Sequence, residues 1–366
     1  MSSKPLLTFP PPPVSGLARY RTLSPLASIR VSPLCLGGMS IGDKWQEFGM
    51  GFMDKESSFN LLNTYFDLGG NFIDTANSYQ DESSEEFIGE WAEKRNIRDQ
   101  LVIATKYTMN YKRGRDDITH KVNYTGNHAK SLHVSVQESL KKLRTSYIDI
   151  LYVHWWDYTA SVEEVMSALY VLVLQGKVLY LGISGAPAWV VSPFVIYQGP
   201  WSIFDRSLER DILPMVRSEG LALAPWGVLG AGKVRTDEEE ERRKSSGENG
   251  RTLMSPNWER TDQERKVCLV LKEIAKEVGV ESITAVTIAY HLLKAHMSSP
   301  SSLRENLQAL DISLTPEQIQ RIESTNEFEP CFSYNIFRNS LDDPWPVKTT
   351  AHIDRVPVQQ AIRPSN

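Results

Sequence analysis

Four titratable side chains lie at or near the ends of separate apolar runs. Asp74 ends NFID and Tyr79 follows five residues later, while Lys106 ends VIATK and His154 follows LYV. A buried lysine beside a carboxylate stays charged and lowers the pKa of a nearby phenol, so we expect a lowered pKa for Tyr79. Such a tyrosine, with a hydrogen-bonded histidine, can protonate a carbonyl oxygen near neutral pH. The four residues therefore predict proton delivery to a carbonyl group that receives hydride from a nicotinamide.

Each of the four residues also has an ordinary structural explanation when it is taken alone. A lysine that ends a strand commonly faces solvent, and a lone histidine is more often a satisfied core residue. Asp74 could cap a turn, and Tyr79 could lie on the surface. The catalytic interpretation therefore depends on the elements that bring all four together.

Strand-length apolar runs alternate with segments of helical period from about residue 18 to about residue 230. The segment ESSFNLLNTYFDLGG, for example, places Phe59, Leu62 and Phe66 on one helical face and ends at two glycines. A repeated strand–helix order predicts a parallel sheet, because parallel neighbours need a crossover connection. The predicted strands are Ser32–Gly37, Asn71–Ala76, Leu101–Lys106, Ile148–Trp156, Val178–Ser184, Pro193–Gln198 and Leu221–Trp226.

This element order favours a closed α/β fold, the (β/α)8 TIM barrel, over an open doubly wound sheet. No GxGxxG turn follows the first predicted strand, which argues against a Rossmann fold. The carboxyl ends of barrel strands converge on one mouth, where catalytic side chains gather. Asp74, Lys106 and His154 would share that mouth with Ser184 and Gln198, which end the fifth and sixth strands.

The segments that carry these residues resemble a known enzyme family. FIDTANSYQDESSEEFIGEW, followed by VIATKY, YVHWWD, GIS, YQGPW and APWGVLG, is similar to the aldo-keto reductases over roughly residues 18–325, especially to their fungal aryl-alcohol dehydrogenase and norsolorinic acid reductase group. The resemblance implies a catalytic tetrad of Asp74, Tyr79, Lys106 and His154, with Tyr79 as the proton donor. It also implies NADP(H) as the cofactor and no metal. The cofactor residues that it implies are Ser184 and Gln198 at the carboxamide, Trp226 on the nicotinamide ring, Leu229 and Gly230 along the pyrophosphate, and Glu305 and Asn306 near the adenine.

Aromatic side chains on two mouth loops suit a flat aryl substrate. Trp45 and Phe48 follow the first strand, and Trp155, Trp156 and Tyr158 follow the fourth. The alternative, that these rings only pack the loops together, stays open. The resemblance implies an aromatic or polyketide-type ketone or aldehyde, reduced to the alcohol or formed from it. It implies a place in fungal secondary metabolism, such as aflatoxin- or sterigmatocystin-type pathways.

Two places depart from a complete barrel. Only GAPAWVVS separates Ser184 from Pro193, whereas a parallel crossover needs about 10 to 12 residues. Between Ala295 and Leu303, HMSSPSS offers no apolar β-branched run for an eighth strand. We therefore expect a barrel that lacks its fifth crossover helix and its eighth strand, from a mis-spliced gene model or a decaying paralogue. Gly185 also replaces the Asn or Asp that the resemblance implies after Ser184.

Length and composition are those of an ordinary globular protein. The chain has 366 residues, 41% hydrophobic and 23% charged, and a net charge of −5, which excludes collagen-like, disordered and disulfide-scaffold classes. There is no basic stripe for nucleic acid, no run of about 18 apolar residues for a membrane span, and no secretory signal. Cys35, Cys268 and Cys331 are far apart, which predicts a cytoplasmic protein. The expected partner is a small aromatic carbonyl compound or alcohol.

We divide the chain into a disordered tail over residues 1–17, the barrel over 18–325 and an irregular tail over 326–366. Within the barrel, the charged stretch Asp237–Lys244 followed by SSGENG predicts a solvated loop. Two other functions compete with the reductase. The first is a barrel that binds a nucleotide without turnover, which the two deletions favour. The second is a TIM-barrel hydrolase, but the sequence has neither the paired mouth carboxylates nor the histidine cluster that such an enzyme needs.

Overall fold

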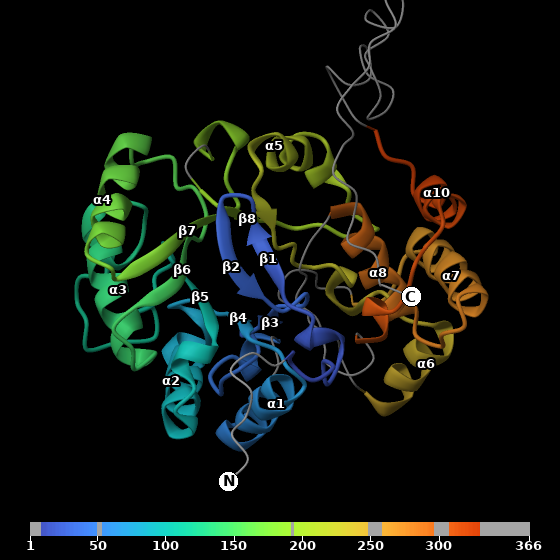
Figure 1. Ribbon diagram of the computed structural model, residues 1–366, viewed down its shortest axis with the longest axis horizontal. Coiled ribbons are helices and arrows are strands. Elements are labelled where there is room, and N and C mark those ends of the chain that lie inside the picture. The colour runs from blue at the N-terminus through green and yellow to red at the C-terminus, as the bar shows by residue number, and fades with distance from the viewer. Residues whose placement is uncertain (1–8, 50–52, 192–193, 248–257, 296–306, 330–366) are drawn as a thin grey trace, which may run out of the picture.

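Seven apolar segments form parallel strands of one curled sheet, in chain order (Figure 1). The computed structural model describes residues 9–49, 53–191, 194–247, 258–295 and 307–329. Each strand has the same neighbours in the sheet as in the chain, as expected of a (β/α)8 barrel. The strands are β3 (Leu36–Gly37), β4 (Phe72–Asp74), β5 (Val102–Tyr107), β6 (Ile148–Val153), β7 (Val178–Ser184), β8 (Ile196–Gln198) and β9 (Ala222–Leu223).

Helices on the outside of the sheet supply most of the crossovers (Figure 1). Capping residues begin them: Asp54 accepts a hydrogen bond from the Ser57 amide at α1, and Thr261 with Glu264 forms a capping box at α7. None of the described helices is long and apolar enough to cross a membrane. They are α1 (Lys55–Asp67), α2 (Ser83–Arg95), α3 (Ala129–Lys142), α4 (Val162–Leu174), α5 (Ile212–Glu219), α6 (Asp237–Ser246), α7 (Asp262–Glu277), α8 (Ile283–Ala295) and α10 (Pro316–Thr325).

The register of the sheet brings the strand ends to one edge. Asp74 lies opposite Ala104 of β5, and Lys106 lies opposite Tyr152 of β6. Further along, Ser184 of β7 lies opposite the last residue of β8. Because all seven strands are parallel, their carboxyl ends form one mouth. The predicted barrel fold and the predicted position of the mouth are therefore confirmed in the described chain.

The fifth crossover is as short as the sequence predicts. Among the described residues between β7 and β8, the chain forms only the 3-10 helix η6 (Ala188–Val190). The segment predicted to lack an eighth strand falls within residues 296–306, outside the described residues. Five predicted strands are longer than the observed ones. β6 ends at Val153 rather than Trp156 and β9 at Leu223 rather than Trp226, and β3, β4 and β8 are also shorter than predicted.

An antiparallel hairpin, β1 (Arg21–Ser24) and β2 (Ala27–Val31), precedes the barrel strands and was not predicted. Asn71, just before β4, holds it by accepting a hydrogen bond from the Ser32 amide and donating one to the Arg30 carbonyl. The hairpin therefore lies at the amino ends of the strands, opposite the mouth. Ala27–Val31 alternates apolar and polar residues, the pattern of a strand buried on one face, and so differs from the continuous apolar runs of the barrel strands.

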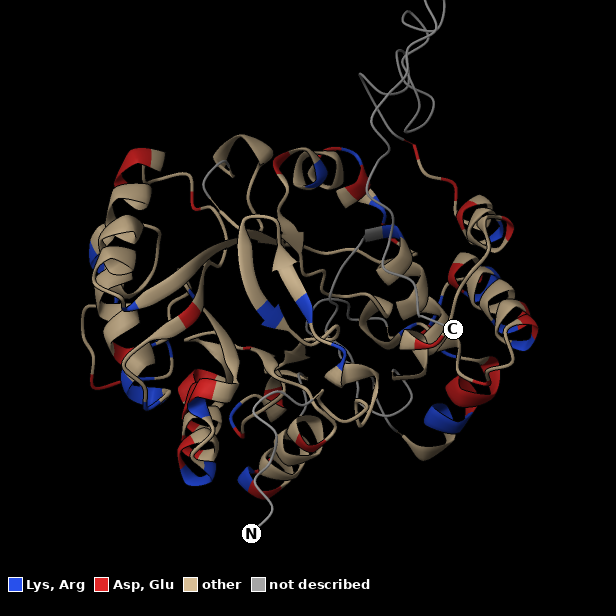
Figure 2. Ribbon diagram, viewed as in Figure 1, with Lys and Arg blue, Asp and Glu red and all other residues tan. Residues whose placement is uncertain are grey.

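The prediction of a solvated loop at Asp237–Lys244 is wrong, because this stretch forms helix α6 (Figure 2). Thr236 caps the helix, and acidic residues in its first turn and basic residues in its last turn suit the helix dipole. Glu240 turns inward and is buried. Its carboxylate accepts hydrogen bonds from Arg235 (3.0 Å) and Arg260 (2.7 Å), so this charged segment is packed against the body.

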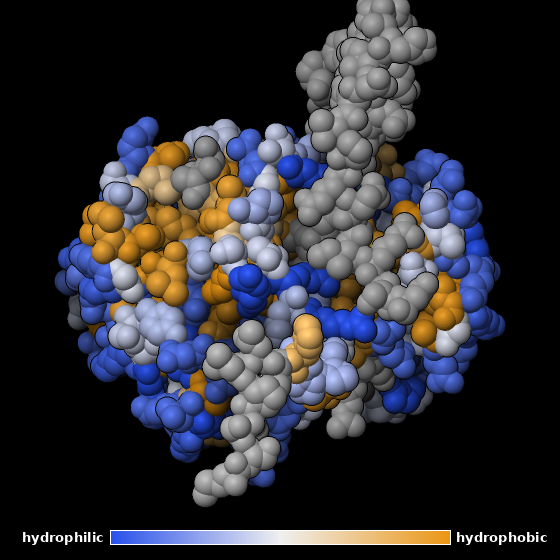
Figure 3. Space-filling view, viewed as in Figure 1, coloured by the Kyte–Doolittle hydropathy of each residue, from blue (hydrophilic) through white to orange (hydrophobic). Residues whose placement is uncertain are grey.

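The short fifth crossover coincides with an exposed apolar patch over α4, β7 and η6 (Figure 3). Leu174 is 68% exposed and Trp189 67%, and Tyr170 and Leu179 are also exposed. A crossover helix would normally cover such a surface. We expect the purified chain to bind a hydrophobic dye and to unfold below about 50 °C, near the lower part of the mesophile range. Cooperative unfolding above that temperature, followed by circular dichroism, would contradict this expectation.

Candidate active site

A buried ion pair lies where β4 and β5 end. Lys106 Nζ donates hydrogen bonds of 2.6 Å to Asp74 Oδ2 and 2.6 Å to the Thr75 carbonyl. Burial works against the charged ammonium group, but the negative charge of Asp74 and the neighbouring Tyr79 outweigh it and raise the pKa of Lys106. Lys106 therefore carries a positive charge at the floor of the mouth.

Tyr79 lies above this ion pair, in the 3-10 turn η3 (Tyr79–Glu82) that follows β4. Its ring centroid is 4.8 Å from Lys106 Nζ, and the His154 ring meets it edge-on at 5.8 Å. The structure thus brings together the four residues predicted to be catalytic. The expectation of a lowered Tyr79 pKa is wrong for this state: burial raises the pKa, and the charge of Lys106 only opposes that rise. Tyr79 consequently holds its proton at neutral pH.

His154 follows β6, and its backbone amide donates to the Tyr107 carbonyl. Burial, with a smaller contribution from the positive charge of Lys106, lowers the pKa of His154 from 6.5 to about 3. Its Nδ1 atom is buried and has no hydrogen-bond partner in the described chain. His154 is therefore a neutral imidazole whose ring lies beside that of Tyr79.

We expect His154 to remain neutral throughout the physiological range. In a ¹⁵N NMR titration its ring resonances should not move between pH 5 and pH 8. Because the unfolded state takes up this proton near pH 6.5 and the folded state only near pH 3, His154 should lower the free energy of unfolding as the pH falls through that window. The exposed His133, followed in the same spectra, serves as the control. A midpoint for His154 near 6.5 would contradict the burial argument.

Gln198 and Ser184 complete the floor of the site from β8 and β7. Gln198 Nε2 donates a hydrogen bond of 3.2 Å to Asp74 Oδ1, so its amide reaches the same ion pair. Both side chains are buried. Gly185 has φ +52°, and its amide donates to the Gln198 carbonyl. Asn and Gly are the residues that adopt this conformation most readily, so the backbone tolerates the substitution noted in the sequence.

The loop after β9 begins with Trp226, whose side chain is 40% exposed. Gly227, Gly230 and Gly232 all have positive φ, which lets the backbone turn sharply after Leu229. A Cβ atom built at Gly227 or Gly232 would meet nothing within 4 Å, so there is open space beside this loop. An exposed ring followed by an open glycine turn fits a planar group with a phosphate tail. Glu305 and Asn306, predicted to lie near the adenine, are outside the described residues.

Four of the five aromatic residues predicted on the mouth loops have accessible rings, and the most exposed of them is Tyr158. The ring of Trp45 lies edge-on to that of Tyr79 at 6.2 Å. Phe48 and Trp155 are exposed on the loops after β3 and β6. Trp156 differs from them, since it is only 3% exposed and packs in the core against Trp189. Trp156 therefore offers no surface to a substrate in this structure.

Arg113 is a residue of this region that the sequence did not reveal. Its guanidinium lies 5.3 Å from the ring centroid of Trp45 and 4.7 Å from that of Phe48, in cation–π contact with both. The loop after β5 is thus joined to the aromatic loop after β3. The run YKRG contains no local signal for this contact, because its partners lie more than sixty positions earlier in the chain.

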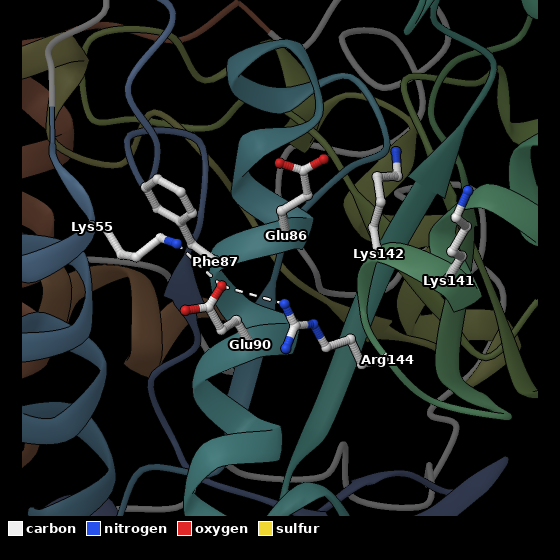
Figure 4. Close-up of a pocket in the computed structure, with 7 residues that line it drawn as sticks. All are labelled: Lys55, Glu86, Phe87, Glu90, Lys141, Lys142 and Arg144. Atoms are coloured by element: carbon white, nitrogen blue, oxygen red, sulfur yellow. Dashed lines mark hydrogen bonds and ion pairs between the residues drawn. The ribbon is translucent and has the colours of Figure 1, made fainter.

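A separate pocket lies between α1, α2 and α3, on the outside of the barrel (Figure 4). Three of its charged residues pair with one another: Glu90 pairs with Lys55 at 3.1 Å and with Arg144 at 3.3 Å. None of the residues predicted to be catalytic lines it. We assign it a structural role.

Comparisons with known proteins agree with this geometry. The model of the aldo/keto reductase family matches residues 33–327. The aryl-alcohol dehydrogenase (NADP(+)) of Phanerodontia chrysosporium is 54% identical, with 97% of this chain and 98% of the relative covered. Norsolorinic acid reductase A of Aspergillus parasiticus is 44% identical, with 98% and 96% covered. A solved thermostable aldo-keto reductase in complex with the inhibitor epalrestat superposes with a TM-score of 0.63 at 26% identity, covering 84% of this chain and 99% of that one.

The alignment with the aryl-alcohol dehydrogenase of Phanerodontia chrysosporium is longer than the part of this chain that it covers. It extends over 376 positions, but 97% of 366 residues is only about 355. About 20 positions of the relative therefore have no counterpart in this chain.

Proposed function

This chain belongs to the aldo/keto reductase family and is an NADP-dependent oxidoreductase, and from that premise we propose that it interconverts an aromatic or polyketide-type ketone or aldehyde and the corresponding alcohol. The observation that carries the proposal is the buried cluster in which Lys106 Nζ lies 2.6 Å from Asp74 Oδ2 and beneath the Tyr79 ring, with His154 beside it.

Tyr79 acts as the general acid in reduction. It holds its proton at neutral pH and gives it to the carbonyl oxygen, and the charge of Lys106 stabilises the phenolate that results. Asp74 keeps Lys106 charged and in place. Neutral His154 can donate a hydrogen bond to the same oxygen without competing as an acid. In the oxidation direction the phenolate takes the proton from the alcohol.

Residues on the other side of the mouth would hold the cofactor. NADP(H), when bound, supplies or accepts the hydride. Ser184 and Gln198 present polar groups to the carboxamide, and the exposed ring of Trp226 can stack on the nicotinamide. Leu229 and Gly230 lie between Gly227 and Gly232, beside which there is open space for the pyrophosphate. Glu305 and Asn306 are proposed at the adenine from the resemblance in sequence alone.

The aromatic side chains around the mouth support an aryl substrate. The ring of Trp45 meets that of Tyr79, and Phe48 and Trp155 are exposed on the loops after β3 and β6, so all three offer flat apolar surfaces. Two of the similar proteins are named for an aryl alcohol and for norsolorinic acid. We place the reaction in fungal secondary metabolism and the protein in the cytoplasm, with residues 18–325 as the catalytic barrel.

Titration of NADPH into the purified protein, followed by tryptophan fluorescence, tests the proposal. We expect saturable quenching with a micromolar dissociation constant, because Trp226 is exposed where the nicotinamide would stack. Trp226→Leu should lose much of the quenching, whereas Trp189→Leu, in the patch over α4, should quench as the parent does. Lack of binding at millimolar NADPH would refute the function for this chain.

A barrel that binds the cofactor without turnover is the second candidate. The fifth crossover, reduced to η6, favours it, because Ser184 and Gln198 lie on the two strands that this connection joins. The two candidates differ in one measurement: quenching by NADPH without consumption of NADPH in the presence of an aryl aldehyde such as veratraldehyde would identify the non-catalytic barrel.

A further inference from the structure

Three consecutive residues after Tyr79 have left-handed backbone conformations. Gln80 has φ 53°, Asp81 has φ 48° and Glu82 has φ 86°, and none of them is glycine. Residues other than glycine rarely adopt this backbone conformation, and those that do usually occur singly. Such a run persists only where surrounding contacts hold it in place. The turn that carries the proton donor is therefore held by its neighbours.

Gln80 fastens one side of the turn to the loop after β3. Its side chain is buried, and Oε1 accepts hydrogen bonds from the amides of Lys44 (3.0 Å) and Trp45 (2.8 Å). Nε2 donates to the Met39 carbonyl at 3.0 Å. Three of the hydrogen-bonding positions of this amide are thus used by a single loop.

Asp81 fastens the turn to the loop after β5. Arg113 donates to both of its carboxylate oxygens, at 2.6 Å and 3.1 Å. This pair is partly exposed, so it is screened by solvent. Asp81 alone is therefore a weak restraint on the turn.

Glu82 provides the buried restraint. Lys112 Nζ donates to both carboxylate oxygens, at 2.7 Å and 2.9 Å, and Lys142 Nζ donates to one of them at 3.0 Å. Lys142 also bonds the Asn77 carbonyl at 3.2 Å, two residues before Tyr79. One carboxylate thereby joins the end of the turn to α3, to the loop after β5 and, through Lys142, to the start of the turn. Charged hydrogen bonds in a buried site are the stronger kind.

We propose that Glu82, held by Lys112 and Lys142, is a positioning residue that keeps this turn left-handed and so fixes the Tyr79 hydroxyl over Lys106. The proposal rests on the proposed function only for its effect on turnover. A displacement of about 1 Å in a proton donor can lower a rate about 100-fold, so the restraint has catalytic consequences.

The comparison of Glu82→Ala with Glu82→Gly isolates this role. Both variants remove the carboxylate, but glycine adopts φ 86° without strain and alanine does not. We expect Glu82→Ala to lower kcat by about 10- to 100-fold with little change in NADPH affinity, and Glu82→Gly to recover most of it. If the carboxylate acted only through its charge, the two variants would lose kcat equally, and the proposal would be overturned.

Hydrogen–deuterium exchange of the peptide over residues 77–87 gives a readout that needs no turnover. Exchange should be faster in Glu82→Ala and close to the parent in Glu82→Gly, even if the chain proves to be a non-catalytic barrel. Equal exchange in all three proteins would overturn the proposal. If Glu82→Ala does not fold, the single variant Lys112→Met and the double variant Lys112→Met with Glu82→Gly provide the same comparison.

Glu209→Ala is the matched control. Glu209 is also a carboxylate with two cationic partners, Arg206 at 2.8 Å and Lys294 at 2.7 Å, and its side chain is only 7% exposed, but it follows β8. This variant should lower stability without changing exchange at residues 77–87 and without lowering kcat as Glu82→Ala does. Slowed turnover and fast exchange of that peptide in Glu209→Ala would show general destabilisation instead of positioning.

Discussion

Tyr79→Phe is expected to lower kcat by about 10²- to 10⁴-fold, the usual contribution of a general acid, while the dissociation constant of NADPH changes little. The substitution removes one hydroxyl group and leaves the ring, which contacts Lys106, His154 and Trp45. Only the proton donated in the transition state is lost. Steady-state kinetics with an aryl aldehyde, together with a fluorescence titration of NADPH, would measure the two effects separately.

Tyr152→Phe is the control for that substitution. Tyr152 is also buried near Lys106, whose Nζ lies 5.7 Å from its ring centroid, and its hydroxyl has no hydrogen-bond partner in the described chain. Removing this hydroxyl should leave kcat unchanged within about twofold, because it forms no hydrogen bond with a group that the reaction uses. Turnover by Tyr79→Phe equal to that of the parent would refute the assigned role of Tyr79.

Lys106→Met is expected to have the largest effect on stability, lowering the free energy of unfolding by about 3–5 kcal/mol. Lys106 is fully buried, and its removal leaves the Asp74 carboxylate in the mouth with only the Gln198 amide as a side-chain donor. Turnover should also fall, because no cation then stabilises the phenolate of Tyr79. Urea unfolding followed by circular dichroism measures the first effect.

The double variant Lys106→Met with Asp74→Asn separates charge from packing. Replacing both partners removes the unpaired buried charge, so part of the lost stability should return while activity stays low. If the double variant were less stable than Lys106→Met by the full cost of a second substitution, the two side chains would not be coupled. The short hydrogen bond between them would then have little energetic weight.

The two pKa shifts at the mouth have a common physical origin. Burial disfavours the phenolate of Tyr79 and the imidazolium of His154, so both groups are neutral before substrate binds. Lys106 keeps its charge because Asp74 compensates for its burial. A neutral donor, a neutral histidine and one fixed cation form a site that is prepared for negative charge on oxygen.

Local patterns in the sequence were sufficient to predict the barrel and its mouth. Continuous apolar runs such as IDILYV mark strands that are buried on both faces, and β6 forms there. Spacing along the chain also revealed the short fifth crossover, since eight residues cannot form a helix and return to the opposite end of the sheet. These inferences succeed because periodicity and connection length are properties of contiguous residues.

Burial and local conformation were harder to predict. The four catalytic candidates meet as expected, but burial sets the direction of the Tyr79 pKa, and burial is not visible in FIDTANSY. Trp155 and Trp156 are neighbours in the sequence, yet one ring is exposed at the mouth and the other is in the core. Helix α6 was missed although its signals are local: Thr236 caps it, and acidic residues precede basic ones along DEEEERRK.

The sequence by itself determined the fold class, the order of the strands and the identity of the groups that gather at their carboxyl ends, because each of these follows from local order along the chain. Only the tertiary structure decided how those groups are held. The three left-handed residues after Tyr79 include no glycine that would predict this conformation. They are held because the side chains of Gln80 and Glu82 form hydrogen bonds with residues about thirty or more positions away. Contacts at that separation stabilise a conformation that local preference opposes.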